Sequence, residues 1–144
     1  MSLLYEKETY QIRGACFWVY KEFGGAFKEK VVDRALTKEL IRRGFKVDDQ
    51  KRIDIYYQGE KVGTYTPDKI VNDSILLEIK CKPFLIKADE EQSWKYLKGS
   101  QYKLGLLINF NPNGLEIKRI IYDKVREKAS NKKRSATDLR RRSA

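Results

Sequence analysis

Two carboxylates and a lysine stand at a spacing that could serve phosphodiester chemistry. Pro67-Asp68 is followed ten residues later by Glu78-Ile79-Lys80. Because side chains alternate along a strand, Glu78 and Lys80 would point to the same face. Carboxylate oxygens suit Mg²⁺, which keeps several waters and completes its shell with substrate phosphate. Such a metal can activate a water for attack, and a lysine can orient that water or stabilise the developing charge. The alternative is a solvated hairpin with cross-strand charge pairs.

A hairpin must bring Asp68 alongside Glu78. Residues 69–71 and 75–80 flank Asn72-Asp73-Ser74, which is typical of a turn between two strands. Ile75-Leu76-Leu77 is an apolar run suited to a buried central strand. A second E-x-K motif, Glu116-Ile117-Lys118, has no Pro-Asp upstream, and its strand alternates as an edge strand would. The first motif is therefore the preferred site.

Glu29 is a third candidate carboxylate. It shares a helical stripe with Val32, Leu36 and Leu40 at positions i, i+3, i+7 and i+11. A carboxylate on a core-facing stripe is costly to bury unless it is paired or bound to a metal. In the first turn of a helix, however, the dipole favours an acid and solvent can reach it. Both interpretations of Glu29 stay open.

Gln92 also has two interpretations. Asp89 and Gln92 resemble a capping box, which predicts a helix that starts at about Asp89 and ends at Gly99. Gln92 would then complete the cap. Alternatively, Gln92 points from the first turn of that helix toward the metal site.

The composition excludes several other kinds of site. The 144 residues include no histidine, so histidine-dependent triads and histidine-ligated zinc sites are excluded. Two cysteines make neither a disulfide framework nor a metal cluster, and Cys81 is expected to pack in the core. No apolar run approaches the length of a bilayer span, and no signal peptide is recognisable at the N-terminus. We therefore expect a cytoplasmic protein.

The charge predicts a polyanionic partner. The formal net charge is +11, and the excess of basic residues is not confined to the tail. Neutralising phosphates releases counterions, so nucleic acid is the favoured partner over a merely solubilising surface. Candidate phosphate contacts in the tail are Lys132, Lys133, Arg134, Arg140, Arg141 and Arg142. Six aromatic residues could stack on bases, although packing within the fold is favoured for most of them: Tyr56, Tyr57, Tyr65, Trp94, Tyr96 and Tyr102.

The remaining pattern predicts one mixed α/β domain. Apolar residues from Ile12 to Phe23 recur at helical spacing until Gly24-Gly25, and a second helix is predicted over residues 27–43. Residues 52–58 and 61–65 flank Gly59 as a hairpin, and residues 103–110 and 115–122 flank a strong turn sequence. The predicted organisation is a domain over residues 1–122 with a partly antiparallel sheet and a basic extension over residues 123–144.

These landmarks resemble a known family. Pro67-Asp68, Glu78-Ile79-Lys80 and Gln92 on a following helix resemble the PD-(D/E)XK nuclease superfamily. More closely, the chain resembles its small GxxExxY proteins over about residues 5–122. The further landmarks are the stretch 23–29, Tyr56-Tyr57, Gly63-Thr64-Tyr65 and the stretch 104–110. The family motif departs at two positions, because its glycine falls at Ala26 and its tyrosine at Val32.

The resemblance implies a fold and a set of roles. It implies a restriction-endonuclease-like core, in which a central mixed sheet is flanked by helices. Asp68 and Glu78 would ligate Mg²⁺ or Mn²⁺, Lys80 would be the catalytic lysine, Glu29 an extra ligand or water-positioning group, and Gln92 the glutamine of the following helix.

The sequence thus predicts a metal-dependent nuclease with DNA as the favoured substrate. The alternative is a non-catalytic module that uses a nuclease fold to bind nucleic acid or a protein, or a subunit of a larger assembly. A protein partner or a homo-oligomer stays open, and a membrane partner is not expected.

Overall fold

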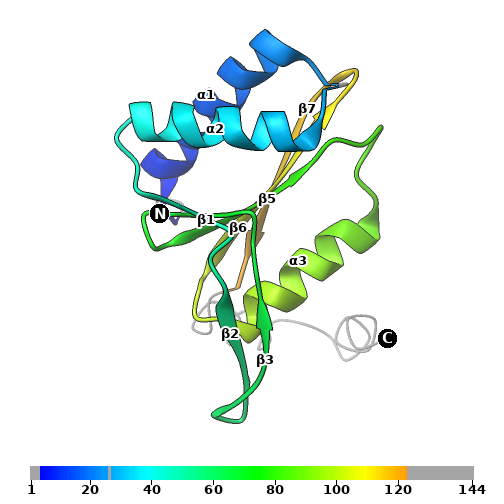
Figure 1. Cartoon of the computed structure of the whole chain (residues 1–144). Coiled ribbons are helices and arrows are strands. Elements are labelled where there is room, and N and C mark those ends of the chain that lie inside the picture. Colours follow the sequence, from blue (N-terminus) through cyan, green and yellow to red (C-terminus); the bar gives the residue numbers. More distant parts are fainter. Residues whose placement is uncertain (1–3, 26, 123–144) are drawn as a thin grey trace.

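The computed structural model describes residues 4–25 and 27–122. Helices and strands alternate in blocks along this part of the chain (Figure 1). In order, the elements are α1 (Glu6–Phe23), α2 (Glu29–Arg42), β1 (Val47–Asp49), β2 (Ile53–Tyr57), β3 (Glu60–Tyr65), β4 (Lys69–Val71), β5 (Ile75–Lys80), α3 (Lys87–Gly99), β6 (Leu104–Asn111) and β7 (Gly114–Ile121).

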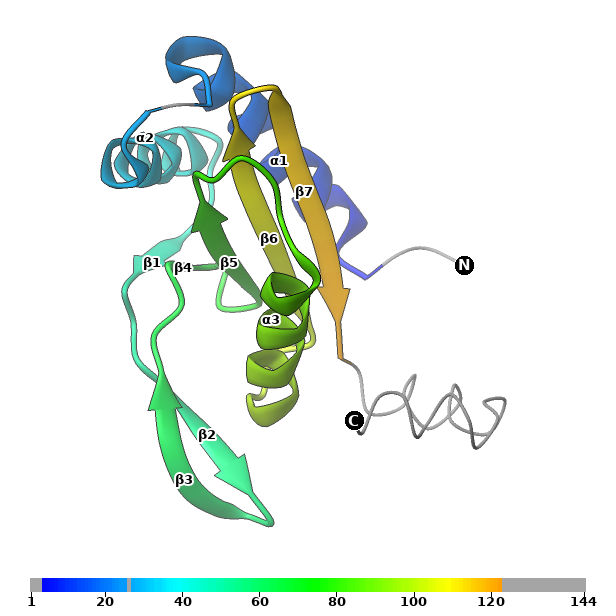
Figure 2. The same ribbon diagram turned by 90° about the vertical axis from the view of Figure 1, so that its right-hand side faces the viewer.

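Five strands form the central sheet in the order β1-β4-β5-β6-β7. The β5–β6 pair is parallel and the other three pairs are antiparallel. Parallel neighbours need a long crossover, which α3 provides. The other two strands, β2 and β3, form a separate antiparallel hairpin that projects away from the central sheet (Figure 2).

Helices cover both faces of the central sheet (Figures 1 and 2). Ile75, Leu77 and Ile79 point to the face covered by α1 and α2, where they join the larger hydrophobic cluster. Leu76, between them, points to the opposite face and packs in a second cluster with Leu97 of α3. The alternation therefore assigns Glu78 and Lys80 to the α3 face. The predicted α/β class with a helix-flanked mixed sheet is confirmed.

The α1–α2 connection depends on a glycine. A Cβ atom at Gly25 would lie 1.9 Å from the backbone oxygen of Asn111 in the β6–β7 turn, so no larger residue fits without backbone movement. The hydroxyl of Tyr20 donates to the same oxygen at 2.9 Å. These contacts fix the end of α1 against the end of the sheet, and α2 starts four residues after Gly25.

Two sequence predictions about elements need correction. The strand β1 was not predicted, because Val47-Asp48-Asp49 is short and acidic; pairing with β4 forms it. The third helix starts at Lys87 rather than at Asp89. Asp89 lies in its first turn and accepts a hydrogen bond from the Ile86 N–H at 2.9 Å, so Asp89 caps the helix from inside it.

No helix among residues 4–25 and 27–122 is both long enough and apolar enough to cross a membrane. The extension over residues 123–144, with its six candidate phosphate contacts, lies outside the described residues, as does Ala26.

Candidate active site

The β4–β5 hairpin brings Asp68 and Glu78 together as the sequence predicts. Lys69 pairs with Leu77, so the preceding Asp68 lies across from Glu78. Asp68 Oδ2 accepts a hydrogen bond from the Ile79 N–H at 2.6 Å, and the backbone N–H of Asp68 donates to the Glu78 carboxylate. These reciprocal contacts hold both carboxylates at the point where the two strands separate.

Glu78 lies in a largely buried position. Burial raises its pKa to about 7, although Lys80 and the Asp68 N–H act in the opposite direction. The Tyr65 hydroxyl donates to Glu78 Oε1. The Tyr65 ring stacks on Tyr96 of α3, with centroids 3.8 Å apart and planes 4° apart. The stack with Tyr96 fixes the position of the Tyr65 hydroxyl, and the hydrogen bond from this hydroxyl restricts the orientation of the Glu78 carboxylate.

Asp68 is half-buried beside it. Burial raises the pKa of Asp68, and the hydrogen bond from Ile79 offsets part of that rise. The charges of Asp33, Lys69 and Lys80 also act on it. Two neighbouring carboxylates with raised pKa values form a place where a cation is electrostatically favoured.

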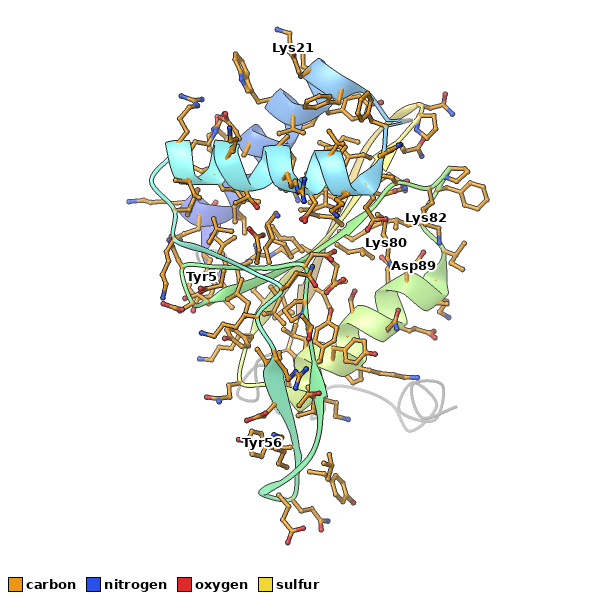
Figure 3. All side chains as sticks on the ribbon, viewed as in Figure 1. Tyr5, Lys21, Tyr56, Lys80, Lys82 and Asp89 are labelled. Atoms are coloured by element: carbon orange, nitrogen blue, oxygen red, sulfur yellow. The ribbon has the colours of Figure 1, made fainter. Side chains whose placement is uncertain are left out.

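Lys80 lies between α2 and α3 (Figure 3). In the part of the chain that the structure describes, its ammonium forms no hydrogen bond or ion pair. Its charge nevertheless lowers the pKa values of Glu78, Asp68 and Glu29. Nearby, Lys82 Nζ contacts Asp89 Oδ2 at 2.8 Å, so that lysine is already paired. Among the described residues, Lys80 is therefore a cation without an ion-pair partner beside the two carboxylates.

Glu29 is the first residue of α2 and is exposed, whereas Val32, Leu36 and Leu40 on its stripe are fully buried. Glu29 is therefore the one residue of this stripe that lies outside the core, because the helix begins at that residue. Partial burial raises the pKa of Glu29, the Asp68 carboxylate raises it further, and Lys80 lowers it. Glu29 thus lies at the rim of the site rather than beneath it.

Gln92 is exposed in the second turn of α3, not at its cap. It lies one helical turn before Tyr96, which stacks on Tyr65. The pocket beside Glu78 is lined by Tyr65, Leu76, Ser93 and Tyr96, and Gln92 is not part of this lining. Gln92 forms no hydrogen bond within the described residues, so no observed contact joins it to Asp68 or Glu78.

Sequence reasoning missed a buried lysine next to Asp68. Lys69 is fully buried, and its Nζ lies 2.5 Å from Asp33 Oδ1, 2.6 Å from Thr37 Oγ1 and 2.8 Å from Asp49 Oδ1. Three oxygens from α2 and β1 satisfy its three protons. The cage connects α2, and hence Glu29, to β4, which begins directly after Asp68. The sequence around Lys69 did not indicate this cage, because its three partners are 20 or more residues away along the chain.

Tyr65 was also not predicted as a site residue, although its place three residues before Asp68 was a usable signal. The second E-x-K motif has a different environment. Glu116 on β7 accepts hydrogen bonds from the amides of Asn109 and Asn111 at 2.8 and 3.0 Å, and these lower its pKa. The charge of Lys118 also lowers this pKa, but no second carboxylate acts on Glu116, so it fits a structural contact.

The two cysteines do not fit a nucleophile. Burial raises the pKa of Cys16 to about 12 and that of Cys81 to about 11, so both are neutral thiols at physiological pH. Cys81 packs against the larger hydrophobic cluster, as expected.

The donor set fits a hard divalent cation. Asp68 and Glu78 supply carboxylate oxygens, and Mg²⁺ is usually held by one or two carboxylates with water and phosphate. Within residues 4–25 and 27–122, no three acidic or thiol side chains form a ready-made metal cage. The arrangement is therefore a pair of carboxylates with Glu29 at the rim, and water and a substrate phosphate would have to complete the shell of a cation bound there.

One comparison with a known structure supports the fold. The chain is similar to the crystal structure of SSO0001, with a TM-score of 0.52 and 16% identity over 92% of this chain and 70% of that one. A crystal structure of an alkaline exonuclease from Laribacter hongkongensis matches with a TM-score of 0.47 and 17% identity over 90% of this chain and 76% of that one. None of the curated proteins compared matches the chain.

A family model gives the assignment. The model for the PD-(D/E)XK nuclease superfamily matches residues 6–120, which include all three helices, strands β1 to β6 and all of β7 except its last residue. Asp68 and the pair Glu78 and Lys80, which the hairpin brings together, stand in the order of the motif that names that superfamily. The chain belongs to the PD-(D/E)XK nuclease superfamily.

Proposed function

We propose that this protein hydrolyses phosphodiester bonds of nucleic acid, with DNA as the favoured substrate, and that a divalent cation binds at Asp68 and Glu78. The observation that carries the proposal is the pairing of these two carboxylates beside Lys80, whose ammonium has no partner among the described residues. Membership of a nuclease superfamily supports it, and the net charge of +11 supports a polyanionic substrate.

The residues would divide the work as follows. Asp68 and Glu78 would hold Mg²⁺ or Mn²⁺, which when bound supplies a Lewis acid for the phosphate and lowers the pKa of a water. Lys80 would orient the attacking water or stabilise the charge on the pentacovalent phosphorus. Glu29 and Gln92, at the rim, would contact water or the scissile phosphate. Tyr65 would keep the Glu78 carboxylate in its orientation.

We also propose that the chain is one of the small GxxExxY proteins of the superfamily. The position of Glu29 at the rim of the site supports this, because that glutamate is the part of the motif the chain retains. Val32, which stands at the tyrosine of the motif, is fully buried, so no side chain at that position reaches a substrate in this protein.

The experiment compares cleavage of single- and double-stranded DNA and RNA in Mg²⁺, Mn²⁺ or EDTA. Asp68→Asn keeps an oxygen that can accept from Ile79 but removes the charge, and Lys80→Ala removes the ammonium. We expect metal-dependent cutting by the wild type, with losses of at least about 100-fold in both variants. No cutting of any substrate, together with retained nucleic-acid binding, would instead support a non-catalytic binding module.

A further inference from the structure

The β2–β3 hairpin forms an arm. Its root packs against α3, and the residues at its tip are exposed to solvent. It shares no strand pairing with the central sheet and projects beyond it (Figures 1 and 2). At the root, Ile53 is buried in the cluster that contains Leu97 of α3. A Cβ atom at Gly99 would lie 2.7 Å from Ile55 Cγ2, so the arm packs closely on the end of α3. These contacts hold the arm in place relative to the site.

One face of the arm continues past the helix that covers it. Ile53, Ile55 and Tyr57 alternate along β2 on the same face. Their exposure rises along the strand, because α3 ends at Gly99: Ile53 is buried, Ile55 is half-buried, and Tyr57 is 65% exposed. An isolated hairpin is only marginally stable in water, and an uncovered aromatic ring at its end adds nothing to its packing. The tip therefore offers a flat apolar surface to a ligand.

The adjacent tyrosine has a different environment. On the opposite face, Lys61 Nζ lies 3.1 Å from Asp54 Oδ1, and the Tyr56 hydroxyl donates to Asp54 Oδ2 at 3.4 Å. Tyr56 is thus part of a polar cluster within the arm. The Tyr57 hydroxyl accepts only from the amide of its neighbour Gln58, at 3.3 Å, which leaves both faces of the ring unstacked by any other described ring.

The face of the arm that carries Tyr57 also carries Tyr65, which contacts a candidate metal ligand. Tyr65 stands at the other end of β3 on this face and donates to Glu78. Strand β3 contains a bulge, so the length is counted along β2, where Tyr57 lies four residues beyond Ile53, the partner of Tyr65. The two tyrosines are therefore roughly 13 Å apart along the arm at about 3.3 Å per residue. A nucleic-acid strand that carries one charge per ~3.4 Å would span this distance with about four nucleotides.

Two exposed lysines lie near the end of α3. Lys95 is exposed and lies one helical turn before Gly99, on the side of the helix that meets the arm. Lys98 follows, with its Nζ 5.0 Å from the centroid of the Trp94 ring. Neither lysine has a carboxylate within ion-pair distance among the described residues, so Lys95 is placed to meet a phosphate.

We propose that Tyr57 is a stacking platform for an unpaired base of a bound DNA strand that extends from Asp68 and Glu78 to the tip of the arm, with Lys95 available to its phosphates. Aromatic stacking tolerates any base and favours unpaired strands, because each base offers its flat face. The inference rests on the proposed function only in that the strand is a nucleic acid that reaches the carboxylates.

The test measures binding of a fluorescent 12-nucleotide oligo(dT) to the full chain in EDTA, so that no cleavage occurs. Tyr57→Ala should weaken binding by about tenfold, while Tyr57→Phe keeps the ring and should bind within twofold of wild type. Tyr56→Ala is the matched control and should also bind within twofold.

Three results would overturn the proposal. These are no binding of the 12-mer by the wild type, a Tyr57→Ala variant that binds it normally, and an equal loss in Tyr56→Ala, which would indicate a general effect on the arm. Circular dichroism of each variant establishes that the fold is unchanged. Cleavage in metal without a Tyr57 effect would leave the proposed function standing and reject the arm. Weaker binding by Tyr57→Ala without cleavage by the wild type would support the stacking role of the arm and reject the proposed nuclease function.

Discussion

At the scale of single residues, the Glu78 carboxyl is the group that the fold perturbs most clearly within the site. Its pKa lies near 7 because the folded chain buries it. A metal that binds there competes with a proton at neutral pH. Any group that favours the ionised carboxylate therefore also favours the metal.

Tyr65 is such a group, since its hydroxyl donates to Glu78. Tyr65→Phe removes the hydroxyl but keeps the ring that stacks on Tyr96. We expect Mn²⁺ affinity, measured by isothermal titration, to fall by about tenfold, as for other residues that support a metal ligand. Tyr20→Phe is the matched control, because the Tyr20 hydroxyl donates to Asn111 away from the site. Equal metal affinity in Tyr65→Phe and wild type would show that the hydroxyl does not support the ligand.

The raised pKa of Glu78 also predicts how stability depends on pH. Between the ordinary value of 4.5 and about 7, the folded chain holds a proton on Glu78 that the unfolded chain has released. Stability therefore falls as pH rises through this window, by up to about 3 kcal/mol without metal. Glu78→Gln cannot titrate, and urea unfolding from pH 4.5 to 7.5 should show a flatter profile for it. Parallel profiles for the two proteins would contradict the assignment.

At the scale of elements, the Lys69 cage joins three pieces of the fold. Its oxygens come from Asp33 and Thr37 on α2 and from Asp49 on β1, while Lys69 itself begins β4 next to Asp68. Because the lysine is fully buried, its charge is tolerated only with these partners.

Lys69→Met would leave Asp33 and Asp49 facing each other without their cation. We expect the free energy of unfolding to fall by about 3–5 kcal/mol, measured by urea denaturation. Lys46→Met removes an exposed ion pair with Asp73 and should leave stability nearly unchanged. Adding Asp33→Asn to Lys69→Met should restore part of the loss. A Lys69→Met protein as stable as wild type would show that the cage does not hold these elements together.

The elements were more predictable than their contacts. Apolar periodicity was enough for α1 and α2, and turn residues were enough for the three hairpins, because these signals are local. The short strand β1 exists only through its pairing with β4, which no local pattern announces. The start of α3 was placed two residues late, because Asp89 caps from within the helix rather than before it.

The arrangement of the candidate site was likewise predictable only in part. Spacing and strand alternation were enough to place Asp68, Glu78 and Lys80 together. Glu29 was ambiguous because a helical stripe does not tell where a helix emerges from the core. Lys69 and Tyr65 act through partners distant in sequence, so their contacts with Asp33 and Glu78 needed the three-dimensional structure.

At the scale of the whole molecule, charge decides how the protein meets a polyanion. The chain carries 31 basic and 20 acidic residues. Six of the basic residues lie in the stretch 131–144, outside the described part of the chain. We propose that this stretch supplies phosphate contacts in addition to those near the site.

Deleting residues 131–144 tests that contribution. If all six basic residues meet phosphates of a single strand, the slope of log affinity against log salt should become shallower by about 4. The measurement is fluorescence anisotropy with oligo(dT) from low to high salt, and Mn²⁺ affinity serves as the control that the site is intact. An unchanged slope at all salt concentrations would exclude the stretch as a phosphate contact.

The most direct test of the account compares one substitution at two E-x-K motifs. Lys80→Met and Lys118→Met each remove one ammonium, but only Lys80 stands beside the Asp68 and Glu78 carboxylates, and Lys118 is exposed on β7. Single-turnover cleavage of labelled DNA in Mg²⁺ or Mn²⁺ should fall by at least about 100-fold in Lys80→Met and stay at the wild-type rate in Lys118→Met. Wild-type cutting by Lys80→Met, or an equal loss in both variants, would contradict a metal-dependent nuclease centred on Asp68, Glu78 and Lys80.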